Sequence, residues 1–176
     1  EYLKLNAKVL ASDVLSYDIV ENHELVNVYV PYMNINNYIY ELFGEFTYMH
    51  NGTVLLQSLM NNQTQNQETI CYVHVSKSQL NITVLDQRKL LLYNSFLYDT
   101  KEDFAYYLLF VLEQLELDPK SAMVKLFGSI EEDDSIFQLC FSYIQNISIF
   151  APSSPQLIKL GEPELKSIDF TLINTI

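Results

Sequence analysis

Residues 70–98 read ICYVHVSKSQLNITVLDQRKLLLYNSFLY, and this stretch decides the fold. It contains three runs rich in β-branched, aliphatic and aromatic residues, at 70–75, 80–85 and 90–98, separated by short polar connections at 76–79 and 86–89. Runs of this composition predict strands, and connections this short favour hairpins. The segment is therefore predicted to form a three-stranded antiparallel meander.

The segment after the meander has the clearest helical pattern in the chain. Apolar residues recur at spacings of three and four positions, which predicts a wide apolar stripe on one side of a helix; they are Phe104, Tyr107, Leu108, Val111, Leu112 and Leu115. Thr100 and Asp103 have the spacing of a capping box, with aspartate in place of glutamate. Asp118 and Pro119 are predicted to stop this helix, which we expect to cover one face of the meander.

The pattern then alternates between strand and helix. Residues 122–127 predict a strand ending at Gly128, residues 136–144 predict an amphipathic helix, and residues 147–150 predict a last strand. The order from Ile70 is therefore β-β-β-α-β-α-β. This is the order of a ribonuclease H-like lobe, whose later strands join the sheet in parallel through helical crossovers. The fold class is predicted to be α/β, with mixed sheets flanked by helices.

The first sixty residues predict the order strand, helix, strand, helix. A β-branched run at 25–30 is stopped by Pro31, and an apolar stripe at helical spacing follows, with Asn34 as the N-cap and Gly44 just after the end. Residues 46–49 predict a short strand, and residues 51–60 carry apolar side chains on one helical face.

A polar segment of low complexity predicts the domain organisation. Residues 63–69 have nothing to bury and are interpreted as a linker between two lobes. The expected parts are the remainder of a first lobe at 1–62, a second lobe at 70–150 and a C-terminal extension at 151–176. This extension contains Pro152, Pro155 and Pro163 and then a short apolar run at 170–173, and we expect it to pack along the lobes without regular structure.

Composition narrows the possible partners. The formal net charge is −12, and the ten lysines and arginines are scattered, which argues against DNA or RNA, whose phosphates are bound mainly by basic side chains. Apolar runs all fall short of the roughly 18 residues that a membrane-spanning helix needs. We therefore expect a soluble, cytoplasmic protein. Cys71 and Cys140 lie far apart in apolar segments and are interpreted as buried, reduced thiols.

Three segments carry a resemblance to a known family. Residues 93–96, 103–110 and 124–128 resemble an uncharacterised Bacteroidetes family with an actin-like ATPase fold, and the segment beginning at Val14 looks like the end of its first lobe. The chain is more distantly similar to the pilus-assembly and cell-division members of the actin superfamily. The resemblance covers roughly residues 13 to 150. It implies an actin-like fold whose first lobe lacks its opening three-strand meander.

The same resemblance puts the nucleotide site in question. Active members of the superfamily carry an Asp-x-Gly motif at the first hairpin of each lobe, where it handles phosphate and metal. The corresponding hairpin here reads His74, Val75 and Ser76, without the carboxylate or the glycine. The glycine pair that accommodates the base is reduced to Gly128. The positions of a degenerate phosphate site would be His74, Ser76, Lys77 and Gly128.

Each candidate site residue has a structural alternative. His74 is either a phosphate contact or general base, or a structural residue at the end of a strand. Ser76 to Ser78 either hold an anion or form an ordinary hairpin turn. Residues 131–134 are all acidic and either bind a cation or complement the dipole of the next helix. His23 and His50 lack the spaced partners of a zinc site. In each case the structural interpretation is favoured, so no catalytic residue, metal or cofactor is assigned.

The leading hypothesis is a non-catalytic actin-like domain that acts as an interaction or scaffold module, binding a protein partner or a second copy of itself. One alternative is an ATP-binding enzyme whose missing first-lobe segment supplies the aspartate and the phosphate loop. The other is a small-molecule binder that uses the cleft between the lobes.

Overall fold

The structure is a computed structural model that describes residues 3, 8–63 and 68–150. Its described residues form two compact units, the first ending at Leu59 and the second beginning at Met60. Most of the expected linker at 63–69 and all of the expected C-terminal extension at 151–176 lie outside the described residues. The expected domain boundaries therefore stay predictions.

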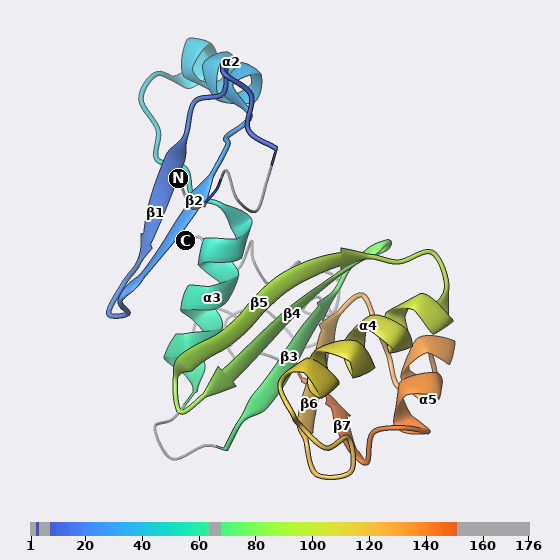
Figure 1. Ribbon diagram of the computed structural model, residues 1–176. Helices are drawn as coiled ribbons and strands as arrows, with labels where there is room; N and C mark the ends of the chain where they lie inside the picture. The colour runs from blue at the N-terminus through green and yellow to red at the C-terminus, as the bar shows by residue number, and fades with distance from the viewer. Residues whose placement is uncertain (1–2, 4–7, 64–67, 151–176) are drawn as a thin grey trace, which may run out of the picture. The chain divides into compact units, whose positions relative to one another are not determined.

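The second unit contains a five-stranded mixed sheet (Figure 1). Its strands are β3 (Ile70–Val75), β4 (Gln79–Asp86), β5 (Lys89–Leu97), β6 (Met123–Gly128) and β7 (Asn146–Ile149), in the order β5-β4-β3-β6-β7. Strands β3, β4 and β5 pair antiparallel, whereas β3 pairs with β6 and β6 with β7 in parallel. The predicted meander and the predicted parallel crossovers are both confirmed.

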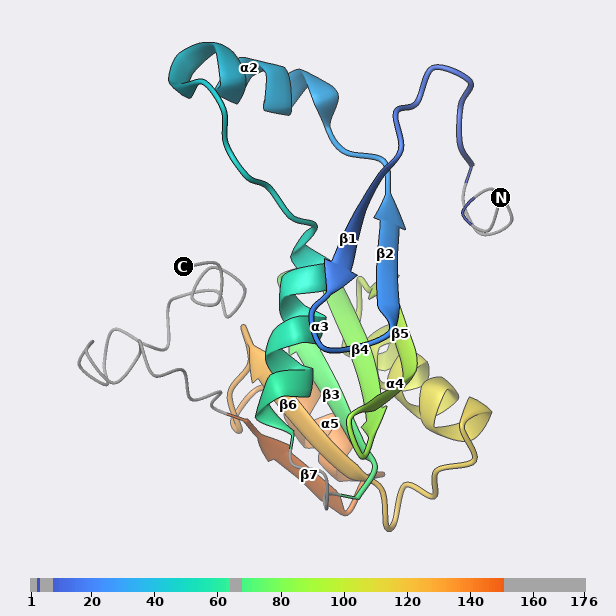
Figure 2. The same cartoon turned by 90° about the vertical axis from the view of Figure 1, so that its left-hand side faces the viewer.

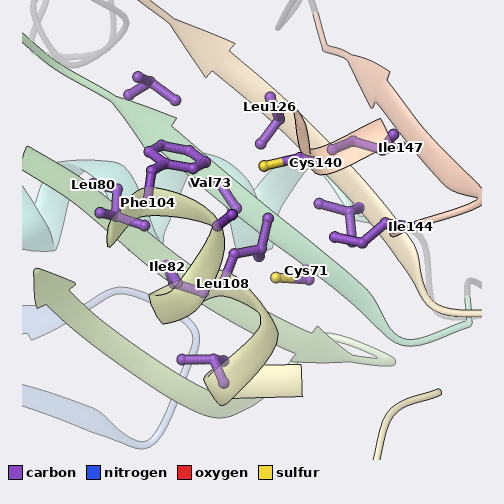
Figure 3. Packing of buried hydrophobic residues seen from close by; sticks show 14 of the residues in the cluster. Cys71, Val73, Leu80, Ile82, Phe104, Leu108, Leu126, Cys140, Ile144 and Ile147 are labelled. Carbon is purple, nitrogen blue, oxygen red and sulfur yellow. The ribbon is translucent and has the colours of Figure 1, made fainter. Parts of the chain in front are cut away.

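Two helices, α4 (Lys101–Gln114) and α5 (Ser135–Phe141), pack on one face of this sheet (Figure 1). Alternate strand residues such as Val73, Ile82 and Leu126 meet Phe104 and Leu108 of α4 in a common core (Figure 3). All five are fully buried. Burying a side chain of this kind contributes roughly 1.5–3 kcal/mol, so this face supplies much of the free energy of folding of the second unit.

Helix α4 begins as predicted. The Thr100 hydroxyl accepts a hydrogen bond from the Asp103 backbone N–H at 3.1 Å, and the Asp103 carboxylate accepts one from the Thr100 N–H at 3.0 Å. The capping box is therefore complete, although aspartate is shorter than the usual glutamate.

The predicted end of α4 at Asp118 and Pro119 was wrong, because the helix stops at Gln114. Glu116 takes a left-handed conformation with φ of 55°, and the Leu117 N–H donates to the Leu112 carbonyl at 2.8 Å. This is the hydrogen bond of a Schellman motif, which ends the helix before the proline is reached.

The first unit begins with a hairpin of β1 (Ser16–Val20) and β2 (Leu25–Tyr29), followed by the helices α2 (Met33–Phe43) and α3 (Asn51–Asn62), the last of which continues past Leu59. The observed order is strand, strand, helix, helix, so the predicted order was wrong in two places. Strand β1 was missed. Residues 46–49 form no strand, because nothing in the described part of the chain pairs with them and β propensity alone does not make a strand.

Of the two predicted ends of α2, the N-cap was wrong and the glycine after the last residue is confirmed. The helix begins at Met33 with Tyr32 at the N-cap position, so Asn34 lies inside it and the predicted N-cap was wrong. Gly44 follows the last helical residue as predicted. Its φ of 79° suits glycine, and its N–H donates to the Tyr40 carbonyl at 2.8 Å.

A substitution in the capping box tests this account of α4. Thr100→Ala removes one hydrogen bond of the box and is expected to lower the free energy of unfolding by about 1 kcal/mol in urea titrations followed by circular dichroism. Lys101→Ala is the matched control, since the Lys101 ion pair with Glu102 spans 4.0 Å between exposed side chains and contributes little. Equal effects of the two substitutions would contradict the importance of the cap.

Candidate functional site

The residues of the predicted phosphate site lie at the ends of two neighbouring parallel strands. His74 is next to last in β3, Ser76 follows that strand, and Gly128 is the last residue of β6. The register pairs His74 with Phe127, and Val75 with Gly128. The structure therefore brings His74, Ser76 and Gly128 together, and Lys77 lies exposed in the adjacent turn.

Gly128 is required by the backbone around it. Its φ of 97° disfavours other residues. A Cβ atom at this position would overlap the carbonyl oxygen of Val75 and lie 2.9 Å from Cδ2 of His74. The close approach of β6 to β3 and to the His74 ring therefore explains this glycine without any ligand.

The backbone groups around the turn are used within the chain. The Ser76 N–H donates to the Gln79 carbonyl at 2.9 Å, and the Ser129 N–H donates to the Val75 carbonyl at 2.8 Å. The Tyr98 hydroxyl donates to the Ser76 carbonyl at 2.7 Å. A phosphate nest needs several amides that point outward together. Two of the amides at this position are already committed to the sheet and the turn.

His74 is a buried side chain with only 3% of its surface exposed. Its ring stacks on Phe127 with 5.1 Å between centroids, and Nδ1 lies 3.4 Å from the amide nitrogen of Asn81. A general base must reach the proton that it abstracts. This environment therefore favours the structural interpretation of His74.

The acidic run and the two cysteines are the remaining candidates from the sequence. In the acidic run 131–134, the Asp134 carboxylate accepts from the Glu131 N–H at 2.8 Å, and Asp134 precedes the first residue of α5. Within the described ranges, no group of three or more histidine, cysteine, aspartate or glutamate side chains is placed to hold a metal ion. Burial raises the pKa of both Cys71 and Cys140 to about 12, which keeps these thiols protonated near neutral pH.

The structure also reveals a polar cluster that the sequence pattern did not show. Asp18 in β1 is buried, and its Oδ1 accepts from the Tyr29 hydroxyl at 2.9 Å. Its Oδ2 accepts from the His50 N–H and from the Thr53 hydroxyl, both at 2.7 Å. Because His50 and Thr53 flank the start of α3, the carboxylate satisfies groups at the positive end of the helix dipole. The sequence signal for this cluster would have been an acidic residue on the buried face of β1, but that strand was not predicted.

His50 takes part in the same cap. Its Nδ1 accepts the Gly52 N–H at 2.9 Å, so this nitrogen carries no proton and the ring is neutral. Burial lowers the pKa of His50, and the nearby Asp18 carboxylate partly opposes this effect. The pKa of the Tyr29 hydroxyl is raised by burial and by its hydrogen bond to Asp18. The other lone histidine, His23, lies in the turn between β1 and β2.

An open groove of about 630 Å³ lies within the first unit, between α2 and the segment after it. It is lined mainly by aromatic and amide side chains, among them Asn36, Tyr40, Phe46 and Tyr48. The Asn36 amide nitrogen is buried there and has no hydrogen-bond partner among the residues that the structure describes. None of the candidate residues from the sequence lies in this groove.

None of the helices in the described ranges is both long and apolar enough to cross a membrane.

The energetic cost of adding a Cβ atom at Gly128 can be compared with the cost at a second glycine. Gly128→Ala is expected to lower the free energy of unfolding by more than about 3 kcal/mol, because it combines an unfavourable φ with a clash against the Val75 carbonyl. Gly44→Ala is the control, since Gly44 also has a positive φ but has no atom within 4 Å of a built Cβ. It should cost only about 1–3 kcal/mol. Urea unfolding of both variants gives the comparison, and a Gly128→Ala cost no larger than the control would rule out the clash.

The Asp18 cluster gives a second prediction. Asp18→Asn keeps the shape but replaces an acceptor oxygen by an amide that faces donor groups, so unfolding should become easier by about 1–3 kcal/mol. Asp13→Asn is the control, because among the described residues the hydrogen bond of the Asp13 carboxylate is the one that it accepts from the Leu10 N–H at 2.7 Å, on the surface of the same unit. Amide exchange in the first turn of α3 reports the local effect. Unchanged exchange in Asp18→Asn would show that the carboxylate does not hold the start of the helix.

Comparison with known proteins identifies both the fold and the family of the chain. A protein of Bacteroides thetaiotaomicron, described as having an actin-like ATPase fold and unknown function, has a similar structure, with a TM-score of 0.77 and 21% sequence identity. The match covers 90% of this chain and 62% of that one, so the present chain spans less than two-thirds of its length. The predicted fold class, α/β and actin-like, is thereby confirmed. No protein with a curated description matches the chain. Residues 1–147 match the family described as protein of unknown function DUF3822, and the chain belongs to this family.

Proposed function

We propose that the chain is a non-catalytic actin-like domain that acts as an interaction or scaffold module in the bacterial cytoplasm, with a degenerate nucleotide site. The observation that carries the proposal is the occupied space at the ends of β3 and β6. The His74 ring lies against Gly128 there, and the Ser76 and Ser129 amides bond within the chain.

Nucleotide turnover needs three features at this position. It needs outward-pointing amides for phosphate, a carboxylate that organises magnesium, and room for the ligand to approach the backbone. The hairpin has histidine and serine in place of the Asp-x-Gly residues, and the nearly buried His74 ring fills the space beside Gly128. The resemblance leads one to expect a carboxylate and open space at this position. The hairpin sequence supports neither expectation.

The first unit supports the interaction role. Helix α2 buries none of its side chains, and 78% of Phe43 and 77% of Tyr32 are exposed. Exposed aromatic and aliphatic side chains that gather on one part of a protein mark sites of association. The net charge of −12 argues that the partner is a protein rather than a nucleic acid.

Nucleotide binding provides the decisive test. A ligand that binds only the folded state raises the melting temperature, by an amount equivalent to about 2.7 kcal/mol at 100 times its Kd. We expect no saturable rise with magnesium-ATP or ADP at millimolar concentrations, measured by thermal shift.

Two lysine variants locate any binding that is found. Lys77→Ala removes the exposed charge in the β3–β4 turn, and Lys89→Ala is the control, because Lys89 is an exposed lysine at the other end of the meander. A rise in melting temperature that disappears in Lys77→Ala but survives in Lys89→Ala would overturn the degenerate-site proposal. It would favour the alternative of an ATP-binding enzyme.

A further inference from the structure

One wall of the open groove in the first unit is a single face of α2. The α2 residues that line the groove are spaced by three and four positions, which places their side chains on the same side of the helix; they are Met33, Asn36, Asn37 and Tyr40. Gly44 follows the end of the helix, and the chain then runs on to α3 (Figure 2). This connection supplies the remaining lining residues, 45–48. The groove is therefore formed within one unit, by two segments that adjoin in the sequence.

The aromatic side chains of the groove favour a positively charged ligand. Tyr40, Phe46 and Tyr48 all line it, and the rings of Phe46 and Tyr48 lie with their centroids 5.8 Å apart. A cation within about 6 Å of a ring centroid is attracted to the face of the ring. Glu45 belongs to the same lining, and no lysine or arginine is among the described residues there. Rings and a carboxylate together suit an ammonium or guanidinium group.

The Glu45 carboxylate has no basic partner at ion-pair distance within the described part of the chain. The ion pair found there joins Lys101 to Glu102, which belong to the second unit. The sequence around Glu45 also offers little basic charge, because residues 8–59 contain six acidic residues, one lysine and no arginine. Opposite charges on two surfaces guide them together and exclude partners of like charge. The first unit is therefore complementary to a basic partner.

The Asn36 amide indicates what else the ligand must supply. Its nitrogen is buried in the groove and has no hydrogen-bond partner among the described residues. Buried polar atoms are nearly always hydrogen-bonded, so this donor points to an acceptor that belongs to a ligand. Peptide carbonyl oxygens are acceptors, whereas ammonium and guanidinium groups are donors only. A free organic cation would thus leave the Asn36 amide unpaired, and a peptide with a basic side chain meets both requirements.

We propose that this groove binds a lysine or arginine residue of a partner protein. The charged end of that residue lies between the Glu45 carboxylate and the rings of Phe46 and Tyr48, and a backbone carbonyl of the partner accepts the hydrogen bond of the Asn36 amide. The groove of about 630 Å³ falls within the size range of ligand sites. This inference rests on the proposed interaction role and adds the chemistry of the partner.

A blocked alanine–lysine–alanine tripeptide, titrated into the full chain and followed by NMR, tests the proposal. We expect saturable shifts of the Asn36 side-chain amide and of the backbone amides of residues 45–48. The same peptide with norleucine in place of lysine keeps the carbonyl groups but has no charge, and it should bind at least about threefold more weakly. Butylammonium has the charge without a carbonyl group and should leave the Asn36 side-chain amide unshifted.

Three variants assign the binding to particular residues. Glu45→Gln removes the charge and is expected to weaken binding of the lysine peptide at least about threefold. Glu41→Gln is the matched control, because Glu41 is an exposed glutamate of α2 that does not line the groove. Asn36→Leu should weaken peptide binding without lowering the free energy of unfolding, since it removes a buried donor that has no acceptor in the free protein. Urea titrations of the variants separate loss of binding from loss of folding.

Failure of this proposal is distinct from failure of the degenerate nucleotide site, which the thermal shift with nucleotides tests in the second unit. Four results would overturn the groove proposal. The first is an absence of saturable shifts up to about 10 mM lysine peptide. The second is equal binding of the norleucine peptide, which would show that the groove takes an apolar chain. The third is equal weakening in Glu45→Gln and Glu41→Gln, which would assign the effect to the net charge of the unit. The fourth is a shift of the Asn36 amide by butylammonium as large as that by the peptide, which would identify a small amine as the ligand.

Discussion

The parallel pairing of β3 with β6 is the interaction on which the second unit depends. Strand β3 is the middle strand of the sheet, all six of its residues are buried, and it joins the antiparallel meander on one side to the crossover strands on the other. Its last bond runs from the Ser129 N–H to the Val75 carbonyl, and this contact is possible because Gly128 has no side chain. Helix α5 and strand β7 follow β6 in the chain, so their positions depend on this pairing.

The same contact determines what the end of the sheet can do. In open α/β sheets, ligands bind beyond the carboxyl ends of the parallel strands. Here the ends of β3 and β6 lie close together, and the His74 ring stacks on Phe127 and packs against Gly128. The packing of the His74 ring at Gly128 and the intrachain hydrogen bonds of the Ser76 and Ser129 amides are the observations on which the proposal of a degenerate nucleotide site rests.

The sequence predicted most of the second unit because its signals are local. The period of the three strands, the Thr100–Asp103 capping box and the apolar stripe of α4 each lie within a few residues, and each occurs in the structure. The end of α4 could not be predicted, because glutamate at position 116 gives no sign of the left-handed conformation that it adopts.

The first unit was harder to predict because its strands depend on partners rather than on composition. Residues 46–49 look like a strand but have no neighbour to pair with in the described part of the chain, whereas β1 has only five residues and carries Asp18 at an inward position. Asp18, Tyr29, His50 and Thr53 are far apart in the sequence and form a cluster only when the hairpin meets the start of α3. Among the candidate site residues, the sequence favoured a structural role for His74, but it did not show that Gly128 lies against its ring.

The most direct measurement is a residue-resolved titration of the amide NMR signals of Ser76, Lys77, Ser78, Gly128 and Ser129 with magnesium-ATP and with ADP. If the ends of β3 and β6 are closed by their own packing, these signals stay unchanged up to millimolar nucleotide. Saturable shifts confined to these five amides would contradict the account, because they would show that phosphate reaches a position that His74 and the turn are inferred to fill.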